Sequence, residues 1–528
     1  MVARTSDLPD PVSSRRLLFG LLSAPLILLS VPPAGLWPLS LVALVPLLWA
    51  VRRAPPGRAL ALGWTVGFVV NLVGFHWLVG LGARFGGLST PWGIAVVLAT
   101  ALYQGSIFGW WALASSFLAR AGREAELVGI PLSFALLEAV VPMIFPWYLA
   151  ITASRAWPLL QVAEIGGPPA VSALLVLINL VLSDLGEELG RRSISRATRV
   201  AGAVVVAIVL LGLARAGHVA VARSTSPELS VAVVQPNFGI TSLETRKHEG
   251  ERFIESLQRA TAEAGQRGAE LVVWPESSFP YLFDRALDRE FGAGHPWELR
   301  KGYRGRLLFG SLTHAFGTSV TQNSAVLVSA SGRIAGMYDK QQLLVFGEYV
   351  PLADRFPEWA KRTRARLPEW PDIAPGGAPS IIEDGGLRIA ALICYEDLIP
   401  ARVHEVARLR PNLLVTVANH AWFEGSSAAR HAAALATMRS VETRRDLVRA
   451  TNTGVSSIVD ALGRVQVEGP LYATSPGPQA SADILMGRVR LANTVALGPH
   501  LAPLFPVMCA VALAVVVLRG RRRRSAAS

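Results

Sequence analysis

Long apolar runs fill the first 216 residues of the chain, and one more lies close to its C-terminal end. A helix that spans a bilayer needs roughly 20 apolar residues, which several runs provide, whereas the first, second and sixth are short. The pattern predicts about eight transmembrane helices. In chain order, the runs lie near 17–31, 36–51, 59–82, 91–119, 127–151, 169–184, 198–216 and 499–518.

The segment between the seventh and eighth runs follows a different pattern. Short apolar stretches of strand length alternate there with helical stretches, notably Arg246–Gly265 and Ala428–Arg445. This alternation favours a layered α/β domain. We therefore divide the chain into a membrane domain over 1–219, an α/β domain over 220–495, and a C-terminal transmembrane helix with a basic tail over 496–528. The strand-length stretches are Leu229–Gln235, Glu270–Pro275, Leu307–Leu312, Ser324–Ser329, Leu387–Ile393 and Leu413–Ala418.

Composition and charge also favour a membrane protein. Hydrophobic residues make up 51% of the chain and charged residues only 17%, below the roughly 25% that soluble domains average. The formal net charge of the chain is +13. Its arginines lie beside apolar runs, a distribution that fits orientation in a membrane better than binding to nucleic acid. The chain contains no zinc finger and no Gly-rich phosphate loop, so we expect no nucleic-acid partner.

The distribution of arginine predicts how the chain crosses the membrane. Connections rich in arginine alternate with connections poor in it, and Arg15 and Arg16 precede the first run. The positive-inside rule then puts both termini in the cytoplasm and the α/β domain outside, which in a bacterium is the periplasmic side of the inner membrane. The first run lacks a clear small-x-small cleavage site, so we interpret it as a retained anchor rather than a signal peptide.

Residues suited to acyl-transfer chemistry stand where apolar stretches end. Glu276 follows one such stretch, Lys340 stands after Tyr-Asp, and Cys394 follows the run Leu387–Ile393. A thiol needs a base or a lowered pKa to become a good nucleophile, and a carboxylate can be that base. A positive charge can stabilise the oxygen of a tetrahedral intermediate. Taken alone, each residue also has a non-catalytic explanation: Cys394 as a buried core thiol, Glu276 as a loop carboxylate and Lys340 as a surface amine.

The second cysteine, Cys509, is far from Cys394 in the chain and lies in the last apolar run. Two cysteines are too few for a Cys-rich zinc site, and we expect no disulfide between them. No cluster of metal ligands appears, so no metal or organic cofactor is predicted.

The order of three motifs resembles the nitrilase (carbon–nitrogen hydrolase) superfamily. These are Trp-Pro-Glu ending at Glu276, then Lys340 with Gly-Glu-Tyr-Val-Pro around Glu348, then Cys-Tyr-Glu beginning at Cys394. The resemblance implies an αββα sandwich for the α/β domain. It also implies that Glu276 is the general base, Cys394 the nucleophile and Lys340 the oxyanion stabiliser. The N–H of Tyr395 would be a second oxyanion donor.

The flanking membrane helices narrow the resemblance to the membrane-bound acyltransferases that complete bacterial lipoproteins. It implies that Cys394 takes a fatty acyl chain from a phospholipid donor and holds it as a thioester. The acceptor would be the free α-amine of a diacylglyceryl-modified apolipoprotein, with both substrates in the lipid bilayer. By the same resemblance Glu348 and Glu396 support the site, Glu348 by orienting Lys340 or Glu276, and Glu396 structurally.

Two further segments supply candidate substrate-binding residues. Between Pro351 and Pro371 the chain is basic and aromatic, and we predict an arm at the lipid interface with tryptophan at headgroup level. A second segment, Asn419–Phe423, contains the candidate Trp422. In it His420 departs from the family pattern, as does the pair Glu424-Gly425 that follows. The residues of the arm are Arg355, Trp359, Lys361, Arg362, Arg364, Arg366 and Trp370.

Other assignments remain open from the sequence. A membrane-tethered amidase or nitrilase would use the same three residues with water as the acceptor. A transporter with an appended domain would need ionisable residues in its helices, and Glu138 is one such carboxylate. A papain-like scheme would pair Cys394 with a histidine, and the available ones are His404, His420 and His431.

Overall fold

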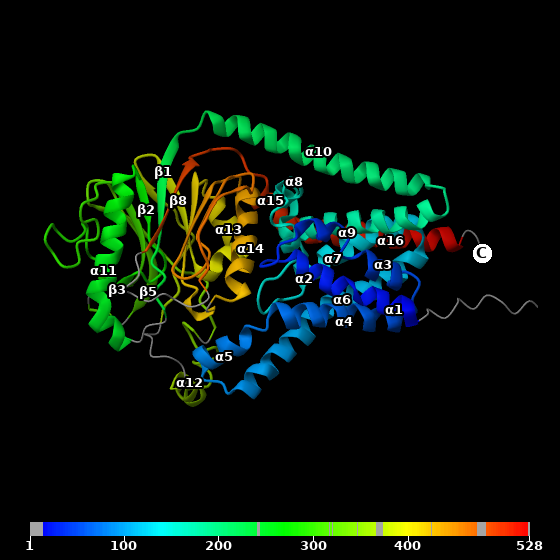
Figure 1. The fold of residues 1–528 in the computed structure, drawn as a ribbon, viewed down its shortest axis with the longest axis horizontal. Coiled ribbons are helices and arrows are strands. Elements are labelled where there is room, and N and C mark those ends of the chain that lie inside the picture. The colour runs from blue at the N-terminus through cyan, green and yellow to red at the C-terminus, as the bar shows by residue number, and fades with distance from the viewer. Residues whose placement is uncertain are drawn as a thin grey trace, which may run out of the picture.

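The computed structural model describes residues 14–239, 243–315, 317–318, 320–345, 347–365, 373–423, 425–472 and 482–525. A bundle of helices lies on one side of the molecule and a two-sheet α/β domain on the other (Figure 1). The long helix α10 (Arg196–Ser224) runs along the bundle toward the first strand, and continues beyond the predicted boundary at 219.

Within the described residues, five helical segments are long and apolar enough to cross a membrane. They are Pro56–Gly74, Thr90–Ala121, Ala163–Gly190, Arg196–Ser224 and Gly498–Gly520. Besides α10, the bundle contains α1 (Ser14–Leu21), α2 (Ser23–Ser30), α3 (Val45–Val51), α4 (Pro56–Gly74), α5 (Leu78–Gly86), α6 (Thr90–Ala121), α7 (Ile130–Val140), α8 (Trp157–Leu160), α9 (Ala163–Gly190), α15 (Gly498–Leu501) and α16 (Phe505–Ser525).

The count of eight transmembrane helices remains a prediction, because three of the predicted runs form shorter helices. The run near 17–31 contains α1 and α2, and the run near 36–51 contains a short 3-10 turn followed by α3. The run near 127–151 is helical only as far as Val140, because Pro142 follows and proline does not continue a helix. Apolar composition alone does not reveal such breaks.

Several of the bundle's arginines meet at one end of it. Arg52 and Arg123 both pair with Asp184, and Arg519 near the C-terminus pairs with Glu124 at 3.2 Å. This end carries α1 and the end of α16, and it lies away from the α/β domain in Figure 1. Arginines from distant parts of the sequence therefore share one end of the bundle, as their alternation along the chain suggested.

The candidate carboxylate inside the bundle has a structural contact. Glu138 of α7 is buried, and its Oε1 accepts a hydrogen bond from the N–H of Leu149 at 2.7 Å. Leu149 begins the 3-10 segment η3 (Leu149–Ala153). Glu138 therefore fixes the connection that follows α7.

Two sheets make up the α/β domain. The first has the order β13-β1-β2-β4-β5-β6 with β3 beside β4, and the second has the order β12-β11-β10-β9-β8-β7. The strands are β1 (Glu228–Gln235), β2 (Leu271–Val273), β3 (Phe279–Asp284), β4 (Arg306–His314), β5 (Thr321–Val328), β6 (Ile334–Asp339), β7 (Ile382–Asp384), β8 (Leu387–Ile393), β9 (Leu413–Ala418), β10 (Leu447–Thr451), β11 (Ser457–Val459), β12 (Val465–Glu468) and β13 (Asp483–Arg490).

The two sheets pack face to face and carry helices on their outer faces. Val231 and Ile389 belong to the apolar layer between the sheets. Ile254 of α11 (Leu243–Gln266) covers the first sheet, while α13 (Pro400–Ala407) and α14 (Ser427–Thr443) cover the second through residues such as Val403 and Ala436. The predicted αββα sandwich is thereby confirmed.

Helix α14 joins the sandwich to the bundle. Its other face contributes Leu435 and Met438 to the apolar cluster that contains Val171 and Leu174 of α9. Burial of apolar surface on both faces of one helix holds the two parts together.

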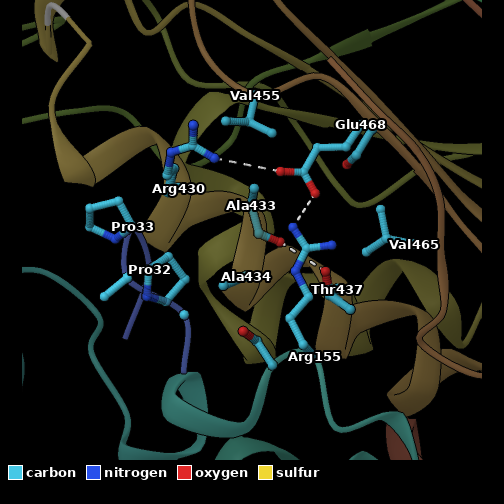
Figure 2. A pocket seen from close by; sticks show the side chains of 14 residues that line it. Pro32, Pro33, Arg155, Arg430, Ala433, Ala434, Thr437, Val455, Val465 and Glu468 are labelled. Carbon is cyan, nitrogen blue, oxygen red and sulfur yellow. Dashed lines mark hydrogen bonds and ion pairs between the residues drawn. The ribbon is translucent and has the colours of Figure 1, made fainter. Parts of the chain in front are cut away.

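A pocket of about 250 Å³ lies at this junction (Figure 2). It is bounded by the turn at Pro32 and Pro33, by α14, and by strands β11 and β12. Arg155 and Arg430 both point toward Glu468, which pairs with each of them. The described residues that line this pocket include none of the candidate catalytic residues.

Candidate active site

The nucleophile candidate stands at the end of a buried strand. Strand β8 is apolar and almost fully buried, and it lies between β7 and its parallel neighbour β9. Cys394 follows it directly and opens the 3-10 turn η4 (Cys394–Leu398). Its φ is +56°, in the left-handed region that a residue with a side chain rarely adopts. Such strain is typical of functional positions, and here it turns the thiol out of the strand.

The carboxylate and the amine candidates come from the facing sheet. Strands β2 and β4 are parallel, and β5 is antiparallel to both β4 and β6. Strands β2 and β6 therefore run in one direction and end at the same edge. Glu276 follows β2, and Lys340 follows β6 directly. The structure thus brings Glu276, Lys340 and Cys394 together at one edge of the sandwich.

The backbone of Glu276 is held by close packing. A Cβ at position 310 would lie 2.5 Å from the Cα of Glu276 and 2.7 Å from the carbonyl oxygen of Pro275, so only glycine fits there. Trp274 is fully buried, and its indole N–H donates to Oγ1 of Thr261 at 2.8 Å. The Trp-Pro-Glu motif therefore anchors the loop that presents Glu276.

A buried ion-pair network links the candidates. Nζ of Lys340, whose residue is 2% exposed, lies 3.3 Å from Oε1 of Glu276 and 2.9 Å from Oε1 of Glu348. Glu348 also accepts the N–H of Leu344 at 2.8 Å, which fixes its own loop. A buried lysine between two carboxylates stays charged, since each carboxylate compensates its lost hydration.

Two asparagines complete the network, and the sequence did not identify them as site residues. Nδ2 of Asn323 donates to Glu276 at 2.8 Å and to Glu348 at 3.1 Å. The backbone N–H of Asn419 donates to the other oxygen of Glu276 at 2.9 Å. Asn323 lies in the polar first half of β5, beside Gln322 and Ser324, so nothing in the local sequence distinguishes its amide from theirs.

The electrostatics of the site keep the thiol protonated. Burial raises the pKa of the Cys394 thiol, and the facing Glu276 carboxylate raises it further, while the Lys340 ammonium opposes both. Burial alone would lower the pKa of Lys340, but the surrounding negative charges, Glu276 foremost, raise it well above its usual range. The thiol therefore needs a partner that removes its proton, and Glu276 is the carboxylate that faces it.

Glu396 links the segment that follows β6, where Lys340 lies, to the end of β8, which Cys394 follows. Its Oε1 accepts the N–H groups of Gln341 and Gln342 at 2.7 and 3.0 Å, just after Lys340. Its Oε2 accepts the N–H of Ile393 at 2.8 Å and the hydroxyl of Tyr338 at 3.0 Å. These contacts support the structural role that the resemblance implied.

A papain-like scheme would pair Cys394 with His404, His420 or His431. The described contacts of these three histidines are made with other groups. Nε2 of His404 lies 2.7 Å from Glu442, and Nε2 of His431 lies 2.8 Å from the carbonyl oxygen of Pro32.

His420, a departure from the family pattern, lies beneath the active-site turn. Nη2 of Arg449 lies 3.3 Å from its Nε2, and Arg449 pairs with Asp397 of η4 at 2.8 Å. Burial lowers the pKa of His420 well below its usual range, and Arg449 lowers it further. A neutral His420 therefore accepts a hydrogen bond and helps to hold η4.

The candidate substrate-binding residues lie on segments beside this edge. Trp422 belongs to η5 (Ala421–Phe423), and its carbonyl oxygen accepts hydrogen bonds from Arg84 of α5 at 3.1 and 3.3 Å. The ring of Phe423 lies 5.1 Å from that of Trp77, in a T-shaped contact. The loop after β9 is thus fixed to the bundle. Glu424 lies outside the described residues.

The basic, aromatic arm contains the short helix α12 (Pro357–Arg364). Lys361, Arg362 and Arg364 lie in its last turn, and Trp359 is 44% exposed. Arg366 and Trp370 lie outside the described residues. Within the described ranges, no group of three or more His, Cys, Asp and Glu side chains is placed to hold a metal ion.

Comparison with known sequences decides the family. The apolipoprotein N-acyltransferase N-terminal domain matches residues 23–181, and the carbon–nitrogen hydrolase domain matches residues 230–493. A relative named apolipoprotein N-acyltransferase, from Geobacter metallireducens, is 31% identical over 98% of this chain and 97% of its own length. The chain belongs to the apolipoprotein N-acyltransferase family.

Other members of the apolipoprotein N-acyltransferase family are similar to a comparable degree. The one from Azotobacter vinelandii is 32% identical over 89% of each chain, and the one from Pseudomonas putida is 29% identical over 94% of this chain and 95% of its own. Among solved structures, an amidase of the nitrilase superfamily from Nesterenkonia AN1 is 17% identical, with a TM-score of 0.37. The match covers 54% of this chain and 99% of the amidase.

Proposed function

We propose that this chain transfers a fatty acyl chain from a membrane phospholipid, through a thioester on Cys394, to the α-amine of the diacylglyceryl-cysteine that begins an apolipoprotein. The observation that carries the proposal is the convergence of Glu276, Lys340 and Cys394 at one edge of the sandwich. Family membership supplies the reaction class, and the apolar bundle beside this edge fits substrates that are embedded in lipid.

In the first half-reaction Glu276 accepts the thiol proton, and Sγ of Cys394 attacks the ester carbonyl of the phospholipid. The ammonium of Lys340 and the N–H of Tyr395 stabilise the negative oxygen of the tetrahedral intermediate. The intermediate then expels the alkoxide of the lysophospholipid, which takes the proton from Glu276. The products are an acyl-thioester on Cys394 and a lysophospholipid.

In the second half-reaction the neutral α-amine of the apolipoprotein attacks the thioester carbonyl. Glu276 takes a proton from the nitrogen as the C–N bond forms, and the same oxyanion contacts act again. The C–S bond breaks, and the thiolate of Cys394 recovers its proton from Glu276. An amide replaces the thioester, so the enzyme returns to its starting state.

The orientation of the chain is part of the proposal. The arginine-rich end of the bundle would face the cytoplasm, with both termini there, and the catalytic domain would lie on the periplasmic side of the inner membrane. The pairing of Arg52, Arg123 and Arg519 at the end away from the sandwich supports this assignment.

The proposal is tested by the intact mass of the purified protein. Incubation with a phospholipid should add the mass of one fatty acyl chain. A peptide that begins with diacylglyceryl-cysteine should remove it and gain the same mass. The three catalytic candidates also suit a hydrolase, so the acceptor decides between the two activities. Loss of the acyl mass to water alone, with no transfer to the peptide, would contradict the proposal.

The arm that contains α12 is predicted to help admit the phospholipid. Its exposed Trp359 and the adjacent basic turn suit a lipid headgroup region, where each cation near the surface contributes about 1 kcal/mol. Replacing Arg362, Arg364 and Arg366 together with glutamine should therefore slow thioester formation about tenfold or more. The rate is measured from the growth of the acyl-enzyme mass.

A control variant replaces Arg267 and Arg304 with glutamine. Both are exposed, and Arg267 follows the outer helix α11, on the face of the first sheet that is turned away from the second sheet and the bundle. This control should acylate at the wild-type rate. The arm would have no role in donor entry if its variant also acylated Cys394 at that rate.

A further inference from the structure

A second cavity, of about 480 Å³, lies at the opposite end of the second sheet from Cys394. Its walls come from the start of β8, the loop between α13 and β9, the end of α14, and the segment 493–500 that leads into α16. Cys394 is at the other end of β8, roughly 20 Å away at the rise of an extended strand. The cavity is therefore separate from the candidate active site.

The lining of this cavity is strongly basic. None of the described residues that line it is acidic, and its charge comes from four arginines, with His500 beside them. These arginines are Arg388, Arg408, Arg410 and Arg445.

Two of these arginines, the buried Arg445 and the exposed Arg408, donate to neutral backbone groups. Arg445 is 6% exposed, and its guanidinium donates to the carbonyl oxygens of Pro411 and Thr494, the latter at 2.7 Å. Burial lowers the pKa of Arg445 to about 10, against a weak opposing effect of Asp446. Arg408 donates from Nε and Nη2 to the carbonyl oxygen of Pro499, at 3.0 and 2.9 Å.

The other two arginines also reach the surface. Arg388 pairs with Glu383 at 3.0 Å on the surface, and Arg410 is exposed at the rim. The pocket of Figure 2 offers a useful contrast, because Arg155 and Arg430 there share the carboxylate of Glu468. The described residues that line the cavity near His500 include no carboxylate to neutralise its arginines. A bound anion would supply that negative charge.

Exposed apolar side chains lie at the cavity and on the membrane helix that follows it. Val495 is 74% exposed and Leu497 is 43% exposed, and both belong to the segment that enters α16. Further along, Val507 and Met508 of α16 are also exposed. α15 lies between the sandwich and the bundle (Figure 1). A basic cavity followed by an exposed apolar track matches a molecule with an anionic head and an apolar tail.

We propose that this cavity binds the phosphate of an anionic membrane phospholipid, whose acyl chains lie along α16. Guanidinium groups suit phosphate because they donate hydrogen bonds in a fixed fork. The ester bonds of a lipid held here are too far from Cys394 to react, so it is a bound lipid and not the acyl donor. It would fasten the C-terminal helix to the catalytic domain at the membrane surface.

The test uses the full-length Cys394→Ala protein in detergent, which cannot turn the lipid over. The probe is a phosphatidylglycerol with a photoactivatable diazirine in one acyl chain. Irradiation followed by peptide mapping should label residues between 493 and 518. Replacing Arg388 and Arg410 with glutamine should lower this labelling about tenfold or more, since both substitutions remove charge-assisted hydrogen bonds to the phosphate.

Arg464 and Arg488 provide the matched control. They are exposed arginines with carboxylate partners elsewhere on the sandwich, and their replacement with glutamine makes the same charge change. The control should label as the unmodified protein does. Equal labelling in the Arg388, Arg410 variant, or labelling spread over the bundle with no preference for 493–518, would overturn the proposal.

A second measurement separates a lipid from free phosphate. In the same preparation, inorganic phosphate should compete with the photoprobe more strongly than chloride at equal ionic strength, because both ligands present a phosphate to the arginines. If inorganic phosphate raised the unfolding temperature through Arg388 and Arg410 while the lipid left 493–518 unlabelled, the assignment to a lipid would be wrong.

Discussion

Replacing Cys394 with alanine is expected to abolish acyl transfer and the acyl-enzyme mass together. The thioester is the covalent link between donor and acceptor, so no residual route through the same site remains when Sγ is absent. Loss of a nucleophile that works with its base as a unit lowers turnover by about 10³-fold or more. Intact mass after incubation with phospholipid checks the first half-reaction, and transfer to a diacylglyceryl peptide checks the second.

Two controls make the result specific. Cys509 is the other free cysteine and is buried in α16, so Cys509→Ala should acquire the acyl mass as the unmodified protein does. Cys394→Ser keeps the side-chain shape but offers a hydroxyl that is far harder to deprotonate, and it should show little acylation. An acyl mass that persists in Cys394→Ala would place the nucleophile elsewhere and remove the central claim.

Two of the three catalytic candidates could be singled out from the sequence because each follows a recognisable feature. Cys394 ends an apolar run of strand length, and Glu276 follows a proline that stops another. Strand β6, which Lys340 follows, was not predicted, since most of its residues are only half-buried and its apolar pattern is weak. The position of Lys340 came from the motif and not from the fold.

Contacts between distant segments could not be predicted in the same way. Asn323 and Asn419 reach Glu276 from two different sheets, and nothing local to either residue indicates that meeting. The basic cavity near α16 gathers arginines from positions 388 to 445 with a segment near 500, so the sequence shows only scattered charge. Breaks in the apolar runs before Pro142 and after Gly74 depend on local backbone chemistry that a count of apolar residues ignores.

Lys340 shows why the choice of variant matters at a buried site. Its ammonium is the cation between Glu276 and Glu348 in the described network. Removing one partner of a buried ion pair typically costs 3–5 kcal/mol of stability, about the margin that a domain possesses. Lys340→Met would therefore lose activity partly by unfolding, and its result would not isolate a catalytic role.

Glu276→Gln is the cleaner test of the base. Glutamine keeps the size of the side chain, and its carbonyl oxygen can still accept the N–H of Asn419 or the amide of Asn323. It cannot take the thiol proton, so thioester formation should fall by about 10²–10⁴-fold, the usual contribution of a general base. The rate of acyl-enzyme growth measures this loss, and an unchanged melting temperature shows that the fold persists.

The pH dependence of the residual rate distinguishes a base from a merely structural carboxylate. Burial and the Glu276 charge both raise the pKa of Cys394, and the substitution removes the second cause. In Glu276→Gln the thiolate must form by loss of its proton to water, so the rate should rise as the pH is raised between about 6 and 9. The wild type, whose proton goes to Glu276, should change much less over that range. A variant that is equally slow at every pH would indicate that Glu276 positions the site and does not act as its base.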